Sequence, residues 1–251
     1  MFGIFKKDAV PESPIKPDRR QWVEESFQWL EKAFGREAIL HRRILTPHHS
    51  DFPIRYNGDP QTANDTLDIL AGQMELALPD LELHFYDDTV NQLSTGSPTG
   101  SKLTLATADD EPAAATTPSW QGRNDSGKYD ITCRKSHLQR PEYLVAVLAR
   151  HLAEIKLLGE GRIAEPNEAL TDMTTLIFGL GIFNANASFT SQNLRIAGSN
   201  ARLTQMEWGY GLALFAHIRK EKKPAWIDHL VKNIRSDFLK SEQYIAYQNP
   251  Q

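Results

Sequence analysis

Apolar residues recur at helical spacing in the first third of the chain. The first such set has four members, three or four positions apart: Val23, Phe27, Leu30 and Phe34. Residues so spaced share one face of a helix, and Asp18 and Gly35 suit its N-cap and its end. A second helix is predicted over 61–78, with three inward residues: Leu67, Leu70 and Met74.

The middle of the chain follows a different period. Residues 81–86 alternate apolar and polar positions, 101–106 do so more weakly, and 128–133 form a third candidate strand. A period of two is typical of strands with one buried face. The three segments predict a small, mostly antiparallel sheet.

Helical spacing returns after Pro141. Four helices are predicted, over 141–158, 167–187, 203–220 and 225–239, and the first begins at Pro141 and ends before Gly159. Gly179 and Gly181 lie inside the second of these helices, where they either permit close packing or weaken the helix. The expected fold class is α+β, with the sheet packed on a largely helical domain. We expect one domain over 18–251 after a flexible, proline-containing tail over 1–17.

Composition narrows the class of protein. The chain has 251 residues, a net charge of −4 and a pI of about 6.1, so no nucleic-acid partner is indicated. No segment is apolar over the ~18 residues that a membrane span needs, and the N-terminus lacks a signal-peptide pattern. Cys133 is the single cysteine, which precludes an internal disulfide and fits a reducing compartment. We therefore expect a cytoplasmic protein without a membrane span.

One stretch carries a recognisable motif. Residues 150–154 read Arg-His-Leu-Ala-Glu, 157–159 read Leu-Leu-Gly, and 168–172 read Glu-Ala-Leu-Thr-Asp before a helix punctuated by glycines. This stretch resembles a bacterial zincin-like metallopeptidase family, whose members read H-E-L-x-H, L-L-G and E-x-L-T-D-L. Weaker likeness over 52–60, 209–216 and 224–226 extends the resemblance to most of the chain.

The resemblance implies a zincin-like fold and, in typical relatives, a zinc cofactor. Two histidines at i and i+4 lie on one helix face and reach one metal ion. The glutamate beside the first histidine is the general base that takes a proton from zinc-bound water. A glutamate on the following helix is the third ligand, and an aspartate four residues on supports a ligand.

The chain departs from that motif at its centre. Arg150 stands at the first histidine of the family, His151 at its glutamate and Glu154 at its second histidine. Glu168 and Asp172 keep the downstream pair. A guanidinium is always protonated and offers no lone pair, so no metal and no catalytic residue are expected.

Three interpretations of this stretch compete. In the first, the site is a relic, and Arg150 replaces the metal charge by pairing with Glu154 and Glu168, as the only nearby cation on that helix face. In the second, a rearranged metal site uses His151, Glu154, Glu168 and Asp172, a ligand set that suits manganese or iron. In the third, Arg150 and Glu154 are a solvated surface pair and His151 is a surface histidine.

Other candidate sites are weaker. His48 and His49 lie near Asp51 and could bind a metal, and Cys133 with His137 could suggest a thiol nucleophile. Paired loop histidines and single buried cysteines more often have no such role. The lysines over 220–223 are typical of a solvated helix end.

Two functions follow from the resemblance. The favoured one is a catalytically inactive zincin-like protein that binds another protein, for example an inhibitor or a toxin-immunity protein. Trp120, in the polar segment 109–127, is a candidate contact because aromatic residues are enriched in interfaces. The alternative is a metal-dependent hydrolase or peptidase with a rearranged metal site.

Overall fold

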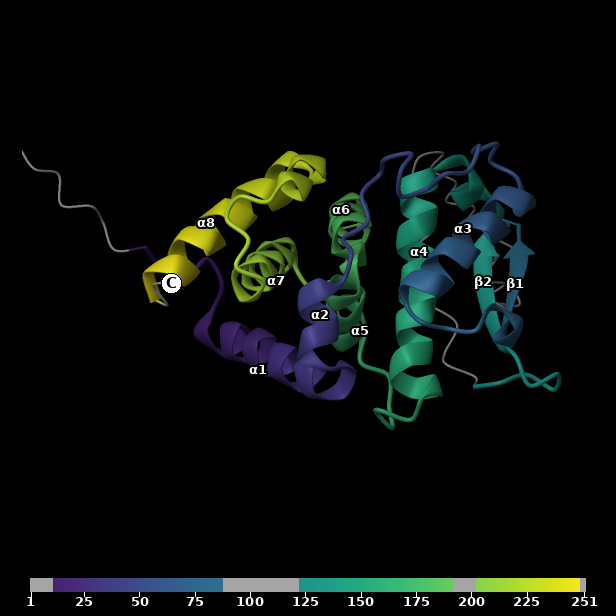
Figure 1. Cartoon of the computed structure of the whole chain (residues 1–251), viewed down its shortest axis with the longest axis horizontal. Helices are drawn as coiled ribbons and strands as arrows, with labels where there is room; N and C mark the ends of the chain where they lie inside the picture. The colour runs from purple at the N-terminus through teal and green to yellow at the C-terminus, as the bar shows by residue number, and fades with distance from the viewer. Residues whose placement is uncertain (1–10, 88–121, 192–201, 249–251) are drawn as a thin grey trace, which may run out of the picture.

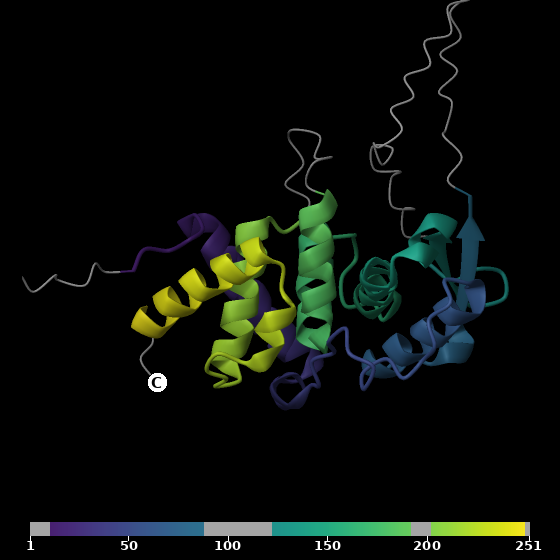
Figure 2. The same cartoon turned by 90° about the horizontal axis from the view of Figure 1, so that it is seen from above.

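A computed structural model describes residues 11–87, 122–191 and 202–248, with the side chains of 189–191 left aside. Its elements stand in layers along the long axis of the molecule (Figure 1). The two strands form one end, α3 (Pro60–Gln73) and α4 (Pro141–Glu154) cover them, α5 (Glu168–Thr175) and α6 (Gly181–Ser191) follow, and α7 (Gln205–Ile218) and α8 (Lys232–Gln248) form the other end. The view from above gives the same order (Figure 2). The fold is thus mixed helix and strand, and α4 lies between the sheet and the central helices.

The sheet has two parallel strands, β1 (Leu81–Tyr86) and β2 (Tyr129–Arg134), in which Leu81 pairs with Tyr129. The prediction of a mostly antiparallel sheet is therefore wrong. A period of two identifies the buried face of a strand but not its direction, and the segment between the strands exceeds the dozen residues that a parallel crossover needs. The third candidate strand, 101–106, lies outside the described residues.

The N-terminal helices agree with the pattern in position but not in their ends. α1 spans Pro17–Phe34, with Pro17 in the first turn and Lys16 rather than Asp18 at the N-cap. A short helix that the pattern did not predict, α2 (Arg36–His41), follows Gly35 directly. α3 is capped by Asp59, whose carboxylate accepts a hydrogen bond from Thr62 N at 2.8 Å.

α3 is also shorter than predicted, because the chain leaves the helix at Met74 and continues in a separate 3₁₀ turn, Leu78–Asp80. Ile15 is buried, so the end of the expected tail packs on the core. Residues 1–10 lie outside the described part.

The central helices are irregular where they approach other elements. α4 continues into a π-helical turn, Ile155–Gly159, and a second π-helical turn, Leu176–Leu180, joins α5 to α6. Gly179 has φ of +77°, and a Cβ there would lie 2.1 Å from the carbonyl oxygen of Arg43. Gly179 thus bends the predicted 167–187 helix and lets the 43–45 segment approach, while Leu45 N donates to Gly179 O at 2.9 Å.

The C-terminal helices pack closely on each other. Thr204 and Glu207 form a reciprocal capping box at the start of α7, and a Cβ on Gly209 would lie 2.6 Å from the Cβ of Asp237 in α8. The helix predicted over 225–239 is confirmed only from Lys232, where α8 begins; its first part is a separate 3₁₀ turn, Ala225–His229. None of the helices in the described ranges has the length and apolar character required to cross a membrane.

Candidate functional site

Arg150 joins the two helices that carry the motif. Its side chain leaves α4, and its two terminal nitrogens donate separately to Glu168 Oε2 and Asp172 Oδ1 on α5. The Arg150 side chain is 11% exposed and that of Asp172 is 0% exposed. Asn167 caps α5 by accepting from Leu170 N at 3.0 Å, which fixes the first turn, where Glu168 stands. The cap thus fixes the end of α5 that carries one of the two ion-pair partners of Arg150.

Asp172 has further partners that the motif does not reveal. Arg202 Nη2 lies 3.3 Å from Asp172 Oδ1, and Leu203 N donates to Asp172 Oδ2 at 3.1 Å. The sequence predicted Arg150 as the only cation near these carboxylates. That prediction is wrong, because Arg202 is a second one. No motif or spacing connects position 202 with 172, so only the folded chain brings them together.

Glu154 forms no ion pair with Arg150 in the described part of the chain, although the two charges interact electrostatically. Within the described part of the chain, Arg150 forms its ion pairs with Glu168 and Asp172, while Glu154 Oε2 lies 3.9 Å from His151 Nδ1. The predicted pairing with Glu168 is present, and that with Glu154 is wrong. The third interpretation, a solvated Arg150–Glu154 pair beside a surface histidine, is also contradicted, because the His151 side chain is only 14% exposed.

Burial shifts the pKa values of these groups in opposite directions. Burial raises the pKa of Glu154 to about 7; Arg150 and Arg202 oppose this shift and Glu168 reinforces it. Burial, with help from Arg150, lowers the pKa of His151 to about 4, against a hydrogen bond with the Thr132 backbone. At neutral pH the imidazole of His151 is therefore uncharged, and the carboxyl group of Glu154 is partly protonated.

The charge of Arg150 is secure in this setting. Burial opposes the charged guanidinium, but the carboxylates of Asp172 and Glu168 outweigh it, and the pKa of Arg150 is raised above its ordinary value. A permanent cation therefore lies on both carboxylates that the motif would use around a metal.

The rearranged metal set does not converge. Among the described residues, the His, Cys, Asp and Glu side chains that lie close enough together to share one ion are Glu82, His84 and Asp130, whereas His151, Glu154, Glu168 and Asp172 do not form such a set. The motif residues therefore do not fit a zinc or manganese ion in this arrangement.

The remaining candidates are the loop histidines and the single cysteine. Asp51 accepts from Arg43 and from Thr46 N at 2.9 Å, so its carboxylate is committed away from His48 and His49. Cys133 is fully buried, with Sγ 3.9 Å from His137 Nδ1. Trp120 lies outside the described residues, so its predicted contact stays a prediction.

Comparison with known proteins adds no relative: no family model matches the chain, and neither a curated protein nor a solved structure is significantly similar to it. The resemblance to the zincin-like family therefore rests on the motif over 150–183 and stays a hypothesis. The geometry around Arg150 is the firmer basis for a function.

Proposed function

We propose that this protein is a catalytically inactive, zincin-like protein-binding module, for example an inhibitor or a toxin-immunity protein. The observation that carries the proposal is the Arg150 guanidinium, which contacts Glu168 and Asp172 at once. These are the two positions that the family resemblance assigns to a zinc ligand and its supporting carboxylate. A fixed organic cation in place of the metal leaves the carboxylates balanced but removes the Lewis acid.

The catalytic groups of the family are missing as well. His151 stands where a general base would be, and its lowered pKa keeps it neutral, but its contacts are Glu154 and the backbone of β2 rather than an open reaction site. The arrangement therefore supports a structural role for the charges.

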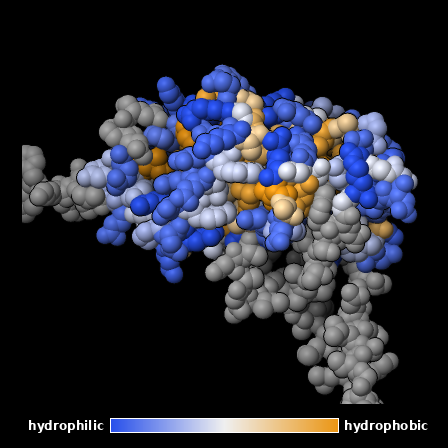
Figure 3. Space-filling view, turned by 90° about the horizontal axis from the view of Figure 1, so that it is seen from below, coloured by the Kyte–Doolittle hydropathy of each residue, from blue (hydrophilic) through white to orange (hydrophobic). Residues whose placement is uncertain are grey.

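Binding of another protein is supported by the surface. Four large hydrophobic side chains in the described ranges are exposed: Leu78, Tyr86, Met206 and Tyr247. Figure 3 shows apolar residues gathered at the surface near the middle of one face. Exposed aromatic and methionine side chains are enriched in interfaces. The sole cysteine, Cys133, is buried and free, in keeping with a cytoplasmic location, where thiols stay reduced.

Metal analysis of site variants tests the loss of catalysis. Protein purified without chelators would be compared with His151→Ala and Glu168→Gln variants by elemental analysis. We expect neither substitution to change the metal content. A stoichiometric metal in the parent protein that both substitutions abolish would overturn the proposal in favour of the rearranged hydrolase.

Capture from the native cell tests the binding function. The full chain would be cross-linked in cells and its partners identified by mass spectrometry, with Met206→Ser/Tyr247→Ser as a matched surface variant. We expect one protein to be recovered with the parent chain at constant stoichiometry. Less of that protein should be recovered with the Met206→Ser/Tyr247→Ser variant. Hydrolysis of a peptide library by the purified chain would contradict the proposal.

A further inference from the structure

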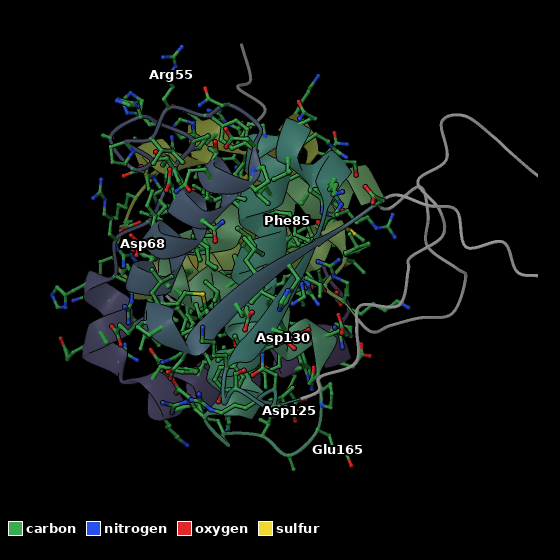
Figure 4. The ribbon with its side chains drawn as sticks, turned by 90° about the vertical axis from the view of Figure 1, so that its right-hand side faces the viewer. Arg55, Asp68, Phe85, Asp125, Asp130 and Glu165 are labelled. Carbon is green, nitrogen blue, oxygen red and sulfur yellow. The ribbon has the colours of Figure 1, made fainter. Side chains whose placement is uncertain are left out.

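The outer face of the sheet gathers three metal-ligating side chains that the motif analysis did not use. Glu82 and His84 are two residues apart along β1, so their side chains share one face of the sheet. The strand register places Asp130 of β2 directly beside Glu82. Figure 4 looks onto this end of the molecule, with Asp130 on the strand pair. One oxygen or nitrogen of each side chain lies within 4.8 Å of the others.

We propose that Glu82, His84 and Asp130 bind one divalent transition-metal ion. Zinc is the ion used to test this proposal. Two ligands that are each about 2.1 Å from one ion lie about 3.0–3.4 Å apart. His84 Nε2 is already 3.1 Å from Asp130 Oδ1 and 4.0 Å from Glu82 Oε1. The Glu82 side chain is 41% exposed, so a rotation about its own bonds closes the remaining gap.

The charge around the three residues favours a cation. In the described part of the chain, Glu82 and Asp130 have no Lys or Arg ion pair, and His84 is the one basic side chain within 4.0 Å of either. The neighbouring Asp80, by contrast, has Arg123 at 3.1 Å. Two carboxylates that share one imidazole leave a negative surplus, which a divalent ion would neutralise.

A residue that is not itself a proposed ligand, Asn124, holds both carboxylates in position. Asn124 Nδ2 donates to Asp130 Oδ1 at 2.7 Å and to Glu82 Oε2 at 3.4 Å. The orientation of this amide is fixed, because its Oδ1 accepts from Ser126 N and Lys128 N, both at 3.0 Å. Donors of this kind hold metal-binding carboxylates in place.

One imidazole with two carboxylates selects the class of ion. An imidazole ligand suits zinc, iron and nickel better than magnesium or calcium, which prefer oxygen ligands alone. The solvent-exposed side of the cluster leaves room for water as a further ligand. Such an ion would bridge two strands that lie far apart in the sequence, and binding would therefore stabilise the sheet.

Calorimetric titration with zinc tests the site. The untagged full chain, stripped with a chelator and desalted, would be titrated at pH 7.5 beside His84→Ala, Asp130→Asn and His41→Ala variants. His41 is the matched control, since it is exposed and lies 3.7 Å from a single carboxylate, Glu37. We expect one zinc ion per chain, affinity reduced at least tenfold by His84→Ala and Asp130→Asn, and no effect of His41→Ala.

Thermal melts provide a second readout. Zinc should raise the melting temperature of the parent protein and the His41→Ala variant but not of His84→Ala. Absence of zinc binding in the parent chain, or equal affinity in the parent and His84→Ala, would overturn the proposal. A His151→Ala variant that keeps the zinc separates this site from the one around Arg150.

Discussion

Arg150 on α4 and Asp172 on α5 form a buried ion pair, in which the Asp172 side chain is fully inaccessible to solvent. Arg150 also contacts Glu168, and Arg202 approaches Asp172 from a distant segment. The stability of the region should therefore depend on this arginine far more than on an ordinary surface charge.

Removing Arg150 should destabilise the fold. Arg150→Ala leaves Asp172 and Glu168 with less positive charge in a buried place, and loss of one partner of such a network costs ~3–5 kcal/mol. We expect the free energy of unfolding at pH 7 to fall by more than ~2 kcal/mol. The lower bound is set below ~3 kcal/mol because Arg202 still balances part of the negative charge of Asp172. Denaturant melts measure it. Arg36→Ala, which breaks the more exposed pair with Glu31, is the control and should cost ~0–1 kcal/mol.

A small effect would reject this view of Arg150. A cost below ~0.5 kcal/mol would be typical of a solvated arginine, and the idea that its charge replaces a metal would fail with it.

Double variants should reveal which carboxylate is coupled more strongly to Arg150. Glu168→Gln in the Arg150→Ala background should recover part of the lost stability, because it removes a charge that the arginine no longer balances. The coupling measured with Asp172→Asn should be larger, since the Glu168 side chain is 31% exposed and that of Asp172 is 0% exposed. Double-mutant cycles from denaturant melts give both values; equal couplings near zero would contradict the buried network.

Glu154 should make the protein less stable as the pH rises. Its folded pKa of about 7 exceeds its ordinary value of 4.5, so between these values the folded state holds a proton that the unfolded state has lost. Its contribution therefore decreases from about pH 4.5 to about pH 7 and is constant above. Glu154→Gln should gain stability relative to the parent across that window, by on the order of 3 kcal/mol. Denaturant melts at several pH values measure the difference, and a difference that does not vary with pH would refute the shifted pKa.

His151 should act in the opposite direction. Its folded pKa of about 4 lies below the ordinary 6.5, so the unfolded state binds the extra proton between these values, and stability is lost as the pH falls from about 6.5 to about 4. A His151→Gln variant should lose less stability than the parent on acidification. The His41→Gln variant is the control, because His41 is exposed, and it should follow the parent. Identical acid profiles for His151→Gln and the parent would show that His151 is not buried as a neutral group.

Gly179 should tolerate no side chain. Its φ of +77° disfavours any residue with a Cβ, and that atom would meet the carbonyl oxygen of Arg43 at 2.1 Å. Gly179→Ala should cost more than ~2 kcal/mol. Gly72→Ala is the matched control, because no atom lies within 4 Å of its added Cβ, and it should be neutral or stabilising by up to ~1 kcal/mol. A tolerated Gly179→Ala in thermal melts would mean that the chain does not bend there.

Reversion of the motif tests the resemblance itself. Arg150→His, His151→Glu and Glu154→His together should provide two histidines and a base beside Glu168, and the variant should bind zinc with at least micromolar affinity. The substitutions belong in the His84→Ala background, so that the sheet site does not contribute. If this variant folds but takes up no zinc, the alignment of α4 with Glu168 is wrong.

The sequence by itself determined the features that depend on near neighbours. Helical spacing located the cores of α1, α3, α4 and α7. Pairing of Glu168 with Arg150 also followed from the motif, because the residues that bracket the site lie on consecutive helices. Such features need only contacts within a few residues or between adjoining elements.

The tertiary structure decided what distant segments contribute. The parallel direction of β1 and β2 depends on the path of the segment between them, which the period-two pattern does not specify. Arg202 reaches Asp172, and Gly179 accommodates the carbonyl of Arg43, through packing of segments that no local pattern connects. Arg150 pairs with Asp172 instead of Glu154 for the same reason: one helical turn brings two side chains near each other, but the packing of α5 on α4 sets which carboxylate the guanidinium meets.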